Sequence, residues 1–262
     1  MITDLAQRWR DHRTSYRPAG EVIDPRRLEV AELLDDSTPR AFVEAHHYSG
    51  SYPAARFRFG LYRAELLEGV AVFSVPCNDK ALAIFPGERL ESVELGRFVL
   101  LDSVAGNGET WFLARCFEQL RAKGLRGVLS FSDPVPRLTV DGRRIFRGHV
   151  GGIYQAHNAI YLGRATARTL RLLPDGRVFS ARTAQKIRSG ERGWRYAVDE
   201  LVAAGARRPG LSDDLGAWLR EQLPAVTRTM RHAGNHRYAW TLQKRDRRHL
   251  GAGLPFPKLL AA

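Results

Sequence analysis

Residues 93–131 read VELGRFVLLDSVAGNGETWFLARCFEQLRAKGLRGVLSF, and this stretch decides the fold. Residues 93–101 are mostly apolar and predict a strand, and residues 127–131 predict a second one. Between them, apolar residues recur at helical spacing over 113–120, and Gly124 marks the end of that helix. Strand, glycine loop, helix and strand make a βαβ unit, which predicts an α/β fold.

The rest of the sequence predicts further elements around this unit. A strand over 27–33 precedes a helix that starts at Asp35–Pro39, where a capping side chain is followed by proline. Two strands, 57–61 and 70–75, form a hairpin that turns at 67–69. We also expect an arm or short helix over 1–20, a loop or short helix over 77–92, helices over 152–160, 181–187, 196–204 and 212–223, and strands from 161 and over 235–242.

The loop inside the βαβ unit carries Gly106 and Gly108. Its backbone N–H groups are expected at a helix N-terminus, where an anion such as pyrophosphate binds well. Gly-x-Gly alone is a weak motif, and the loop lacks the third glycine and the lysine of the established phosphate-binding motifs. A dinucleotide-binding fold is therefore disfavoured.

A second stretch, GHVGGIYQAHNAIYLG at residues 148–163, combines glycines with hydrogen-bonding side chains. Ile153, Ala156 and Ile160 share one face of the helix predicted over 152–160, and Tyr154 leaves at the side of that face. So many glycines indicate a backbone that approaches another group closely. An ordinary helix with tyrosines at the edge of the core fits the same spacing.

The formal net charge of +13 is concentrated in two segments. Residues 163–195 hold nine basic side chains against two acidic ones, and residues 228–249 hold seven against one. Clustered arginine at this density predicts a polyphosphate partner. An arginine-rich proteome or a solvated surface raises the charge as well, but neither explains the clustering. The residues expected to contact phosphates are Arg182, Lys186, Arg188 and Arg192.

Other features of the sequence narrow the class of protein. A hydrophobic content of 44% suits a globular protein. Cys77 and Cys116 match no metal or redox spacing, and we expect Cys116 to be a buried free thiol. Residues 1–13 are too charged for a signal peptide, and no apolar run is long enough to span a membrane. These features predict a cytoplasmic protein without a membrane partner.

The order of the predicted elements resembles the core of the GNAT acyltransferases. More closely, the chain resembles the Mom family of phage DNA adenine-modification proteins. The matching motifs span over half the chain and are His47–Gly50, Glu94–Phe98, Ser130–Asp133, Gly148–Gly163 and Asn235–Tyr238. The resemblance implies a GNAT-like fold with a central mixed sheet flanked by helices. It also implies conversion of adenine in duplex DNA to N6-carbamoylmethyladenine, which would protect phage DNA from restriction in the host cytoplasm.

The resemblance further implies where the site lies. The family's active-site positions fall on His47, Tyr48, Asp133 and Tyr154, and its donor site on Arg97 and Thr110 beside the loop of Gly106 and Gly108. The N6 amine is a poor nucleophile because its lone pair is delocalised, so a general base is needed, and His47 suits that role. Asp133 would orient a group or bind a metal, and Tyr154 would protonate a leaving group. The ordinary alternatives are a helix cap for His47, a turn former for Asp133 and a core anchor for Tyr154.

The cofactor is predicted to be an acyl or aminoacyl donor, either acetyl coenzyme A or glycyl-tRNA. A carbamoylmethyl group joins N6 through a methylene carbon and ends in an amide, so its donor must bring nitrogen, as a glycyl group does. Asn107 departs from the usual GNAT loop and disfavours coenzyme A. Transfer RNA would then be a partner beside DNA. Iron bound by His47 and Asp133 is a further cofactor hypothesis.

The predicted organisation is a single GNAT-like domain. Its core covers 27–163 and 226–243, with a basic helical insertion over 164–225, an N-terminal arm over 1–26 and a basic tail over 244–262. Since N6 must leave the base stack to react, base flipping is expected. Two rival functions remain: an acyltransferase acting on a protein or small amine, and a DNA-binding protein without catalytic activity.

Overall fold

The chain divides into two compact units. The computed structural model describes residues 5–10, 13–18, 22–76 and 78–258. The first compact unit, here called the sheet unit, comprises Met1–Pro134, Gly148–Ala165 and Asn235–Ala262. The second, here called the helical unit, comprises Val135–Arg147 and Thr166–Gly234.

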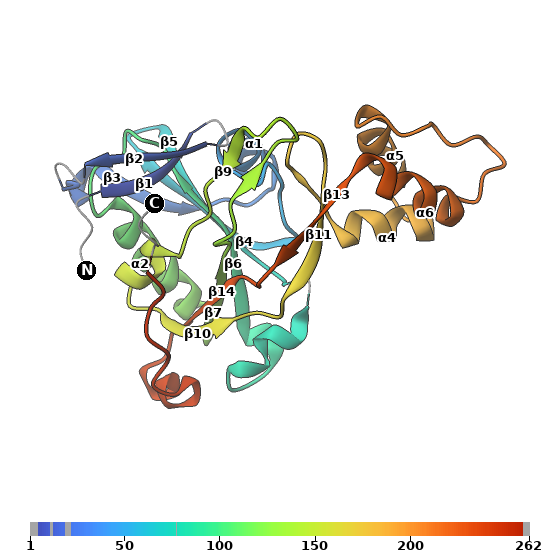
Figure 1. Cartoon of the computed structure of the whole chain (residues 1–262). Coiled ribbons are helices and arrows are strands. Elements are labelled where there is room, and N and C mark those ends of the chain that lie inside the picture. Colours follow the sequence, from blue (N-terminus) through green and yellow to red (C-terminus); the bar gives the residue numbers. More distant parts are fainter. Residues whose placement is uncertain (1–4, 11–12, 19–21, 77, 259–262) are drawn as a thin grey trace. The chain divides into compact units, whose positions relative to one another are not determined.

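A seven-stranded sheet forms the centre of the sheet unit (Figure 1). Its order is β10-β14-β7-β6-β5-β4-β3, and every neighbouring pair is antiparallel except β6 and β7. The parallel pair confirms the predicted βαβ unit. The strands are β3 (Leu28–Glu32), β4 (Ala55–Arg63), β5 (Leu66–Ser74), β6 (Ser92–Leu100), β7 (Gly127–Ser132), β10 (Ile160–Arg164) and β14 (His236–Thr241).

The parallel ladder between β6 and β7 is short. It joins Ser92–Leu95 to Gly127–Ser130, although β6 continues to Leu100. The register of β6 against β5 also shifts at Gly96. Because backbone pairing between the two strands stops at Leu95, side chains can occupy the space between their carboxyl ends.

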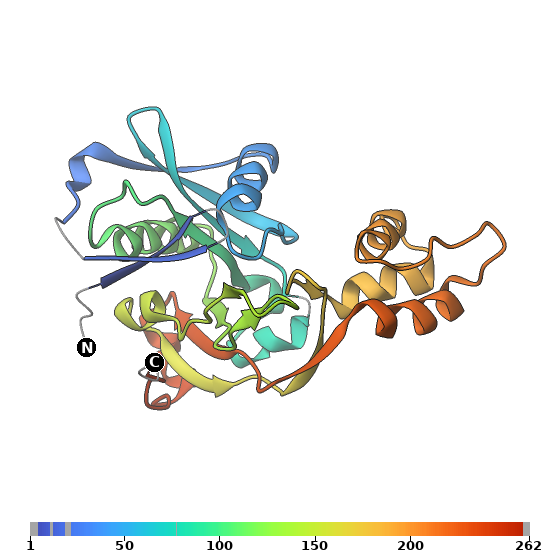
Figure 2. The same ribbon diagram turned by 45° about the horizontal axis from the view of Figure 1, so that its top comes forward.

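The helix α2 (Gly108–Ala122) connects β6 to β7 and covers one face of the sheet, as both views show (Figure 1, Figure 2). Leu113, Cys116, Phe117 and Leu120 are buried, as their spacing predicts. Cys116 is the expected free thiol, and burial raises its pKa well above the ordinary value. Cys77 lies outside the described residues.

Short helices cover part of the opposite face. Leu82 of η2 (Asp79–Ile84) and Leu250 of η4 (Lys244–Leu250) pack in one cluster with Leu129 of β7. The helix α1 (Ser37–His46) lies against β4, β5 and β6. Two further one-turn helices precede strands: η1 (Pro25–Arg27) and η3 (Arg89–Glu91).

The structure corrects the prediction for residues 152–160. The helix α3 spans only Gly152–Ala156, and Ile160 already begins β10. Asn158 takes a left-handed conformation with φ 57°, which ends the helix. Tyr154, predicted at the side of the helix, is buried in the main core.

The structure differs from two other predictions near the N-terminus: the position of the hairpin turn, and the short helix offered as one alternative for residues 1–20. The hairpin turns at Ala64, where φ is 52°, and not at 67–69, because Glu68 lies within β5 and bonds to Arg63. The expected arm or short helix over 1–20 contains a pair of antiparallel strands, which satisfy each other's backbone groups. These strands are β1 (Leu5–Arg10) and β2 (Arg13–Pro18), while residues 1–4, 11–12 and 19–21 lie outside the described residues.

The helical unit packs three helices together, side by side in both views (Figure 1, Figure 2). The predicted helices are confirmed as α4 (Ala181–Ser189), α5 (Trp194–Ala203) and α6 (Leu215–Val226). Sequence patterns missed its short strands, which are β8 (Arg137–Leu138), β9 (Arg144–Phe146), β11 (Arg168–Leu172), β12 (Val178–Phe179) and β13 (Arg228–His232).

The boundaries of the helical unit differ from those of the predicted insertion. The strand β13 pairs with β11, so residues 228–232 belong to this unit and not to the sheet unit. Residues 135–147 belong to it as well, because Val140 N–H donates to Pro174 O and Arg228 donates to Leu138 O. Among the described residues, no helix combines the length and apolar character that crossing a bilayer requires.

Candidate active site

His47 caps the C-terminal end of α1 and is buried. Its backbone N–H donates to Val43 O at 2.9 Å. The Ser49 backbone N–H donates to the ring Nδ1 at 3.1 Å, and Ser49 Oγ lies 2.9 Å from the same atom. Because a backbone N–H only donates, Nδ1 is the acceptor, and the proton of the neutral ring sits on Nε2. His47 in this form offers a hydrogen-bond donor.

Tyr48 links His47 to the end of β7. Its ring lies 4.3 Å from the His47 ring and 5.8 Å, edge-to-face, from the ring of His149. The His149 backbone N–H donates to Asp133 O at 2.8 Å. Asp133 is buried and directly follows β7. Three of the predicted catalytic residues, His47, Tyr48 and Asp133, are therefore joined through His149, which sequence reasoning did not assign to the site.

Arg97 joins the loop after His47 to β6. Its guanidinium donates to Ser51 O at 2.7 Å, Ser51 Oγ at 2.8 Å and Gly96 O at 2.6 Å. Ser51 Oγ in turn lies 3.4 Å from Ser49 Oγ, next to the His47 ring. Arg97, predicted for the donor site, thus braces the segment that carries His47.

Tyr154 reaches the point where β6 and β7 stop pairing. Its hydroxyl interacts with Ser130, and Ser130 Oγ donates to Leu95 O at 2.9 Å. Burial raises the pKa of Tyr154, so this phenol keeps its proton at neutral pH. The rings of Tyr238 and Trp240 pack against it at 5.4 and 5.5 Å. The core-anchor role and a role at the site are both compatible with this position.

Glu94 completes the group and was not assigned by the sequence. It lies on β6, and burial raises its pKa to about 7, an effect that the charge of Arg97 partly offsets. Its charge in turn raises the pKa of Tyr154. A carboxylate between two apolar residues of a buried strand is the signal that could have identified it.

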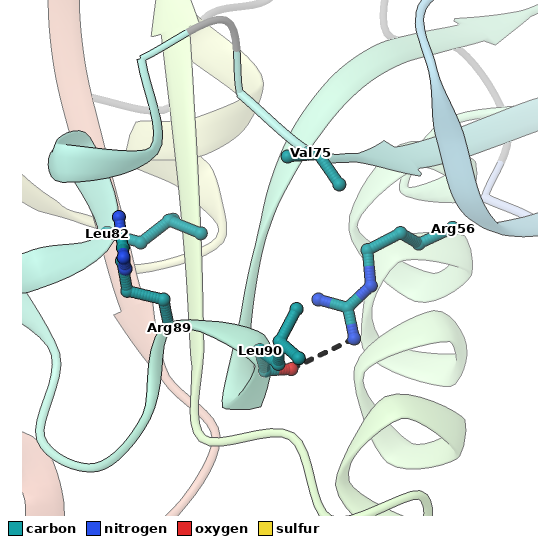
Figure 3. Close-up of a pocket in the computed structure, with 5 residues that line it drawn as sticks. All are labelled: Arg56, Val75, Leu82, Arg89 and Leu90. Carbon is teal, nitrogen blue, oxygen red and sulfur yellow. Dashed lines mark hydrogen bonds between the residues drawn. The ribbon is translucent and has the colours of Figure 1, made fainter.

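An open pocket of about 220 Å³ lies on the sheet unit (Figure 3). Arg56 donates to Leu90 O at 2.9 Å and to Ser92 O at 3.1 Å. Partial burial lowers the pKa of Arg56. Apolar side chains and two guanidinium groups line the pocket, namely Arg56, Val75, Leu82, Arg89 and Leu90. Such a lining suits a planar ring that carries a nearby negative charge.

The glycine loop stands at the start of α2. Gly106 O accepts from the Ile23 backbone N–H at 3.0 Å, and the Gly108 N–H donates to Ala105 O at 3.2 Å. Thr110 Oγ1 donates to Asn107 O at 3.1 Å. The loop residues that were expected to bind the acyl donor therefore already form hydrogen bonds within the protein.

A buried carboxylate also lies in the first turn of α2. Glu109 occupies this turn, where a negative charge is stabilised by the helix N-terminus. The same charge would repel a pyrophosphate.

The four predicted phosphate contacts of the helical unit have different surroundings. Arg182 forms a short ion pair with Glu191, and Arg182 is the main cause of the lowered pKa of Glu191. Lys186 Nζ lies 5.3 Å from the centre of the Tyr196 ring. Arg188 and Arg192 are exposed. The last two are the best placed of the four to meet a partner.

The iron hypothesis lacks a complete ligand set. Within the described part of the chain, no three His, Cys, Asp or Glu side chains are grouped closely enough to hold a metal ion.

Buried ionisable side chains that gather where two parallel strands part are typical of an enzyme active site in a mixed α/β fold. Residues 27–258 match the model of the Mom protein family, and the chain belongs to this family. Membership points to an enzyme of phage DNA modification. No curated protein matches the chain.

Proposed function

We propose that this chain converts adenine in duplex DNA to N6-carbamoylmethyladenine and so protects phage DNA from restriction. Two observations carry the proposal. His47, Tyr48 and Asp133 are linked through His149, and Tyr154 lies where β6 and β7 part, in a chain of the Mom family.

The topology supports a GNAT-like transferase. Seven strands with a single parallel pair, which parts beyond Leu95, and one long helix between the two parallel strands are the arrangement expected of a GNAT core. In such a fold the reacting groups meet between the parting strands. Tyr154 and Ser130 lie at that point.

The target base must leave the duplex to reach this group. The pocket of Figure 3 offers a place for a flipped adenine, since Leu82 and Val75 can contact its faces and Arg56 can bind the adjacent phosphate. The exposed Arg188 and Arg192 of the helical unit would bind the DNA backbone.

We further propose that the donor is an aminoacyl ester, glycyl-tRNA, and not acetyl coenzyme A. An acetyl group brings no nitrogen, whereas a glycyl group holds all atoms of the carbamoylmethyl group. Transfer first gives an N6-glycyl amide. Attack of its free amine on ring carbon 6, followed by cleavage of the original bond between carbon 6 and N6, gives the final connectivity without adding or removing an atom. The engaged glycine loop and the buried Glu109 support a donor without a pyrophosphate.

Nucleoside mass spectrometry on DNA from expressing cells tests the modification. A new adenine derivative with the mass of the carbamoylmethyl form is expected. Unmodified DNA would instead favour an acyltransferase of proteins or small amines, or a binding protein without catalytic activity.

Isotope labelling tests the donor. Purified protein, duplex DNA and glycyl-tRNA labelled in its glycine at both carbons and nitrogen should give adenine that carries all three labels. Label entering from acetyl coenzyme A, and none from glycine, would overturn the donor assignment.

A further inference from the structure

The strands β11 and β13 form an antiparallel ribbon within the helical unit, and both views show them side by side (Figure 1, Figure 2). Residues 168–172 pair with residues 228–232 in one continuous register. Residues paired across a ladder project to the same face, and neighbours along a strand project to opposite faces. The ribbon therefore has two distinct faces.

One face of the ribbon is apolar and belongs to the interior of the protein. Leu170 and Leu172 of β11 are buried. Met230 of β13 lies opposite Leu170 and is half-buried. Burial of this face holds the ribbon in place and fixes which side chains project from the other face.

The other face carries two arginines and two threonines and is here called the arginine–threonine face. Thr169 lies directly opposite Arg231, and Arg171 lies directly opposite Thr229. Arg171 is half-buried, and the other three are exposed. The two arginines thus occupy diagonal positions on the ladder, and each has a threonine beside it on the partner strand.

The two arginines of this face do not hold the fold together. Within the described residues, neither Arg171 nor Arg231 forms a hydrogen bond or ion pair with another group. The sequence has no acidic residue at 166–174 or 226–234. Other arginines of the helical unit do pair with carboxylates, namely Arg177, Arg182 and Arg207. The guanidinium groups of the ribbon are therefore available to an external acceptor.

A two-stranded antiparallel ribbon fits the major groove of B-form DNA, which is about 12 Å wide. In that groove, an arginine donates two parallel hydrogen bonds to O6 and N7 of a guanine. A threonine hydroxyl donates to or accepts from a base edge, and its methyl group contacts the methyl group of thymine. The arginine–threonine face combines both kinds of side chain in a fixed register, a pattern that matches base edges more closely than a row of phosphates.

The ribbon is packed together with the helices of its unit. Leu173 directly follows β11, and Phe179 of β12 lies opposite Arg171 on the other edge of β11. Both Leu173 and Phe179 are buried in the core of α4, α5 and α6. The ribbon therefore belongs to the same packed body as Arg188 and Arg192, for which we propose contacts with the DNA backbone.

We propose that the arginine–threonine face enters the major groove of duplex DNA and reads guanine in the sequence around the modified adenine. The inference rests on the proposed function, which makes duplex DNA the substrate. Arg171 and Arg231 each bind one guanine. Diagonal neighbours on a ladder are about 7–8 Å apart, and successive base pairs about 3.4 Å, so the two guanines lie within about three base pairs of each other. Contacts to bases set the sequence context, whereas contacts to phosphates add affinity on every sequence.

Selection from a duplex library tests this inference with the full-length protein. The library carries random base pairs around one adenine, and the bound duplexes are sequenced. Wild type should enrich guanine at two positions. Arg171→Lys and Arg231→Lys keep the positive charge but lose the planar pair of donors, so each variant should lose the enrichment of one guanine. Arg192→Gln is the matched control, because it should weaken binding to every duplex and leave the enrichment unchanged.

A modified base tests the groove directly. Replacing an enriched guanine by 7-deazaguanine removes N7 from the major groove and keeps the base pair. Wild-type affinity should fall about 5-fold or more, while the lysine variant that no longer selects this guanine should bind both duplexes equally. Equal wild-type affinity for the two duplexes, or unchanged enrichment in both lysine variants, would overturn the inference. Circular dichroism verifies that the variants fold.

Binding and chemistry are measured separately in these experiments. A wild type that enriches the two guanines but makes no modified adenine in cells would defeat the proposed function and leave the groove contact standing. A wild type that modifies adenine, with lysine variants that keep its sequence preference, would defeat only the inference about the ribbon.

Discussion

The two compact units use arginine in different ways. In the sheet unit, Arg97 and Arg56 donate to backbone carbonyls, and Arg126 donates to the buried Asp246 with both carboxylate oxygens engaged. In the helical unit, Arg188 and Arg192 extend from the surface. These three arginines of the sheet unit hold chain segments in place, whereas Arg188 and Arg192 of the helical unit are exposed.

The same contrast holds for the carboxylates. Glu94 and Asp133 in the sheet unit are wholly or partly buried near the predicted catalytic group. In the helical unit, Glu191 and Asp213 form exposed ion pairs with arginine. Exposed pairs contribute little to stability. The contrast is consistent with the proposal that chemistry occurs in the sheet unit and that the helical unit binds a polyanion.

The largest expected effect comes from the catalytic group. Replacing His47 or Asp133 by alanine should lower adenine modification at least about 100-fold, because a positioned proton donor or charge is removed. His46→Ala is a matched control, since the neighbouring His46 ring packs against the edge of Phe42 on α1. Mass spectrometry of DNA from expressing cells measures the product, and circular dichroism verifies folding. Wild-type product from either variant would remove that residue from the mechanism.

Cavities in the two cores should have effects confined to their own units. Leu113→Ala and Leu201→Ala each truncate a fully buried side chain, one in the sheet unit and one in the helical unit, and each should cost about 2–5 kcal/mol. Hydrogen exchange should show reduced protection in β5–β7 for the first variant and in α4–α6 for the second. Equally reduced protection throughout the chain for both variants would contradict the division into two units.

The smallest effect concerns DNA affinity. Converting Lys186, Arg188 and Arg192 together to glutamine should weaken binding on every sequence and lower the salt slope by roughly 0.9 for each phosphate that is no longer neutralised. Arg182→Gln is the internal comparison, since Arg182 is already paired with Glu191 and should change the slope less than Arg192→Gln. An unchanged slope in the triple variant would show that this surface is only solvated.

Periodicity predicted the elements whose own residues bury one face. The helix over 113–120 and the strands around it were confirmed, because apolar spacing within a few turns is sufficient to specify them. The same kind of apolar spacing also predicted the two strands of the hairpin and the three helices of the helical unit. The short strands of that unit were not predicted. The strands β8, β9 and β12 have only two or three residues, too few to show a period, and β11 and β13 pair with each other from distant parts of the chain.

The family likeness was the part of the functional interpretation that the sequence alone determined. Motifs containing His47, Asp133 and Tyr154 could be read from the chain without knowing how they meet. Only the tertiary structure joined Tyr48 to His149, and only it put Glu94 beside Arg97 and Tyr154. The pairing of Arg182 with Glu191 was also hidden, since their distance depends on the turn between α4 and α5.

The difference between what the sequence determined and what the tertiary structure decided has a physical cause. Local patterns record which face of an element is apolar, and that information lies within one stretch of residues. The proton affinity of Glu94 and the hydrogen-bond role of His47 depend instead on burial and on groups brought near by strand pairing. The sequence therefore determined which elements form and to which family the chain belongs, and folding decided which of its polar residues face one another.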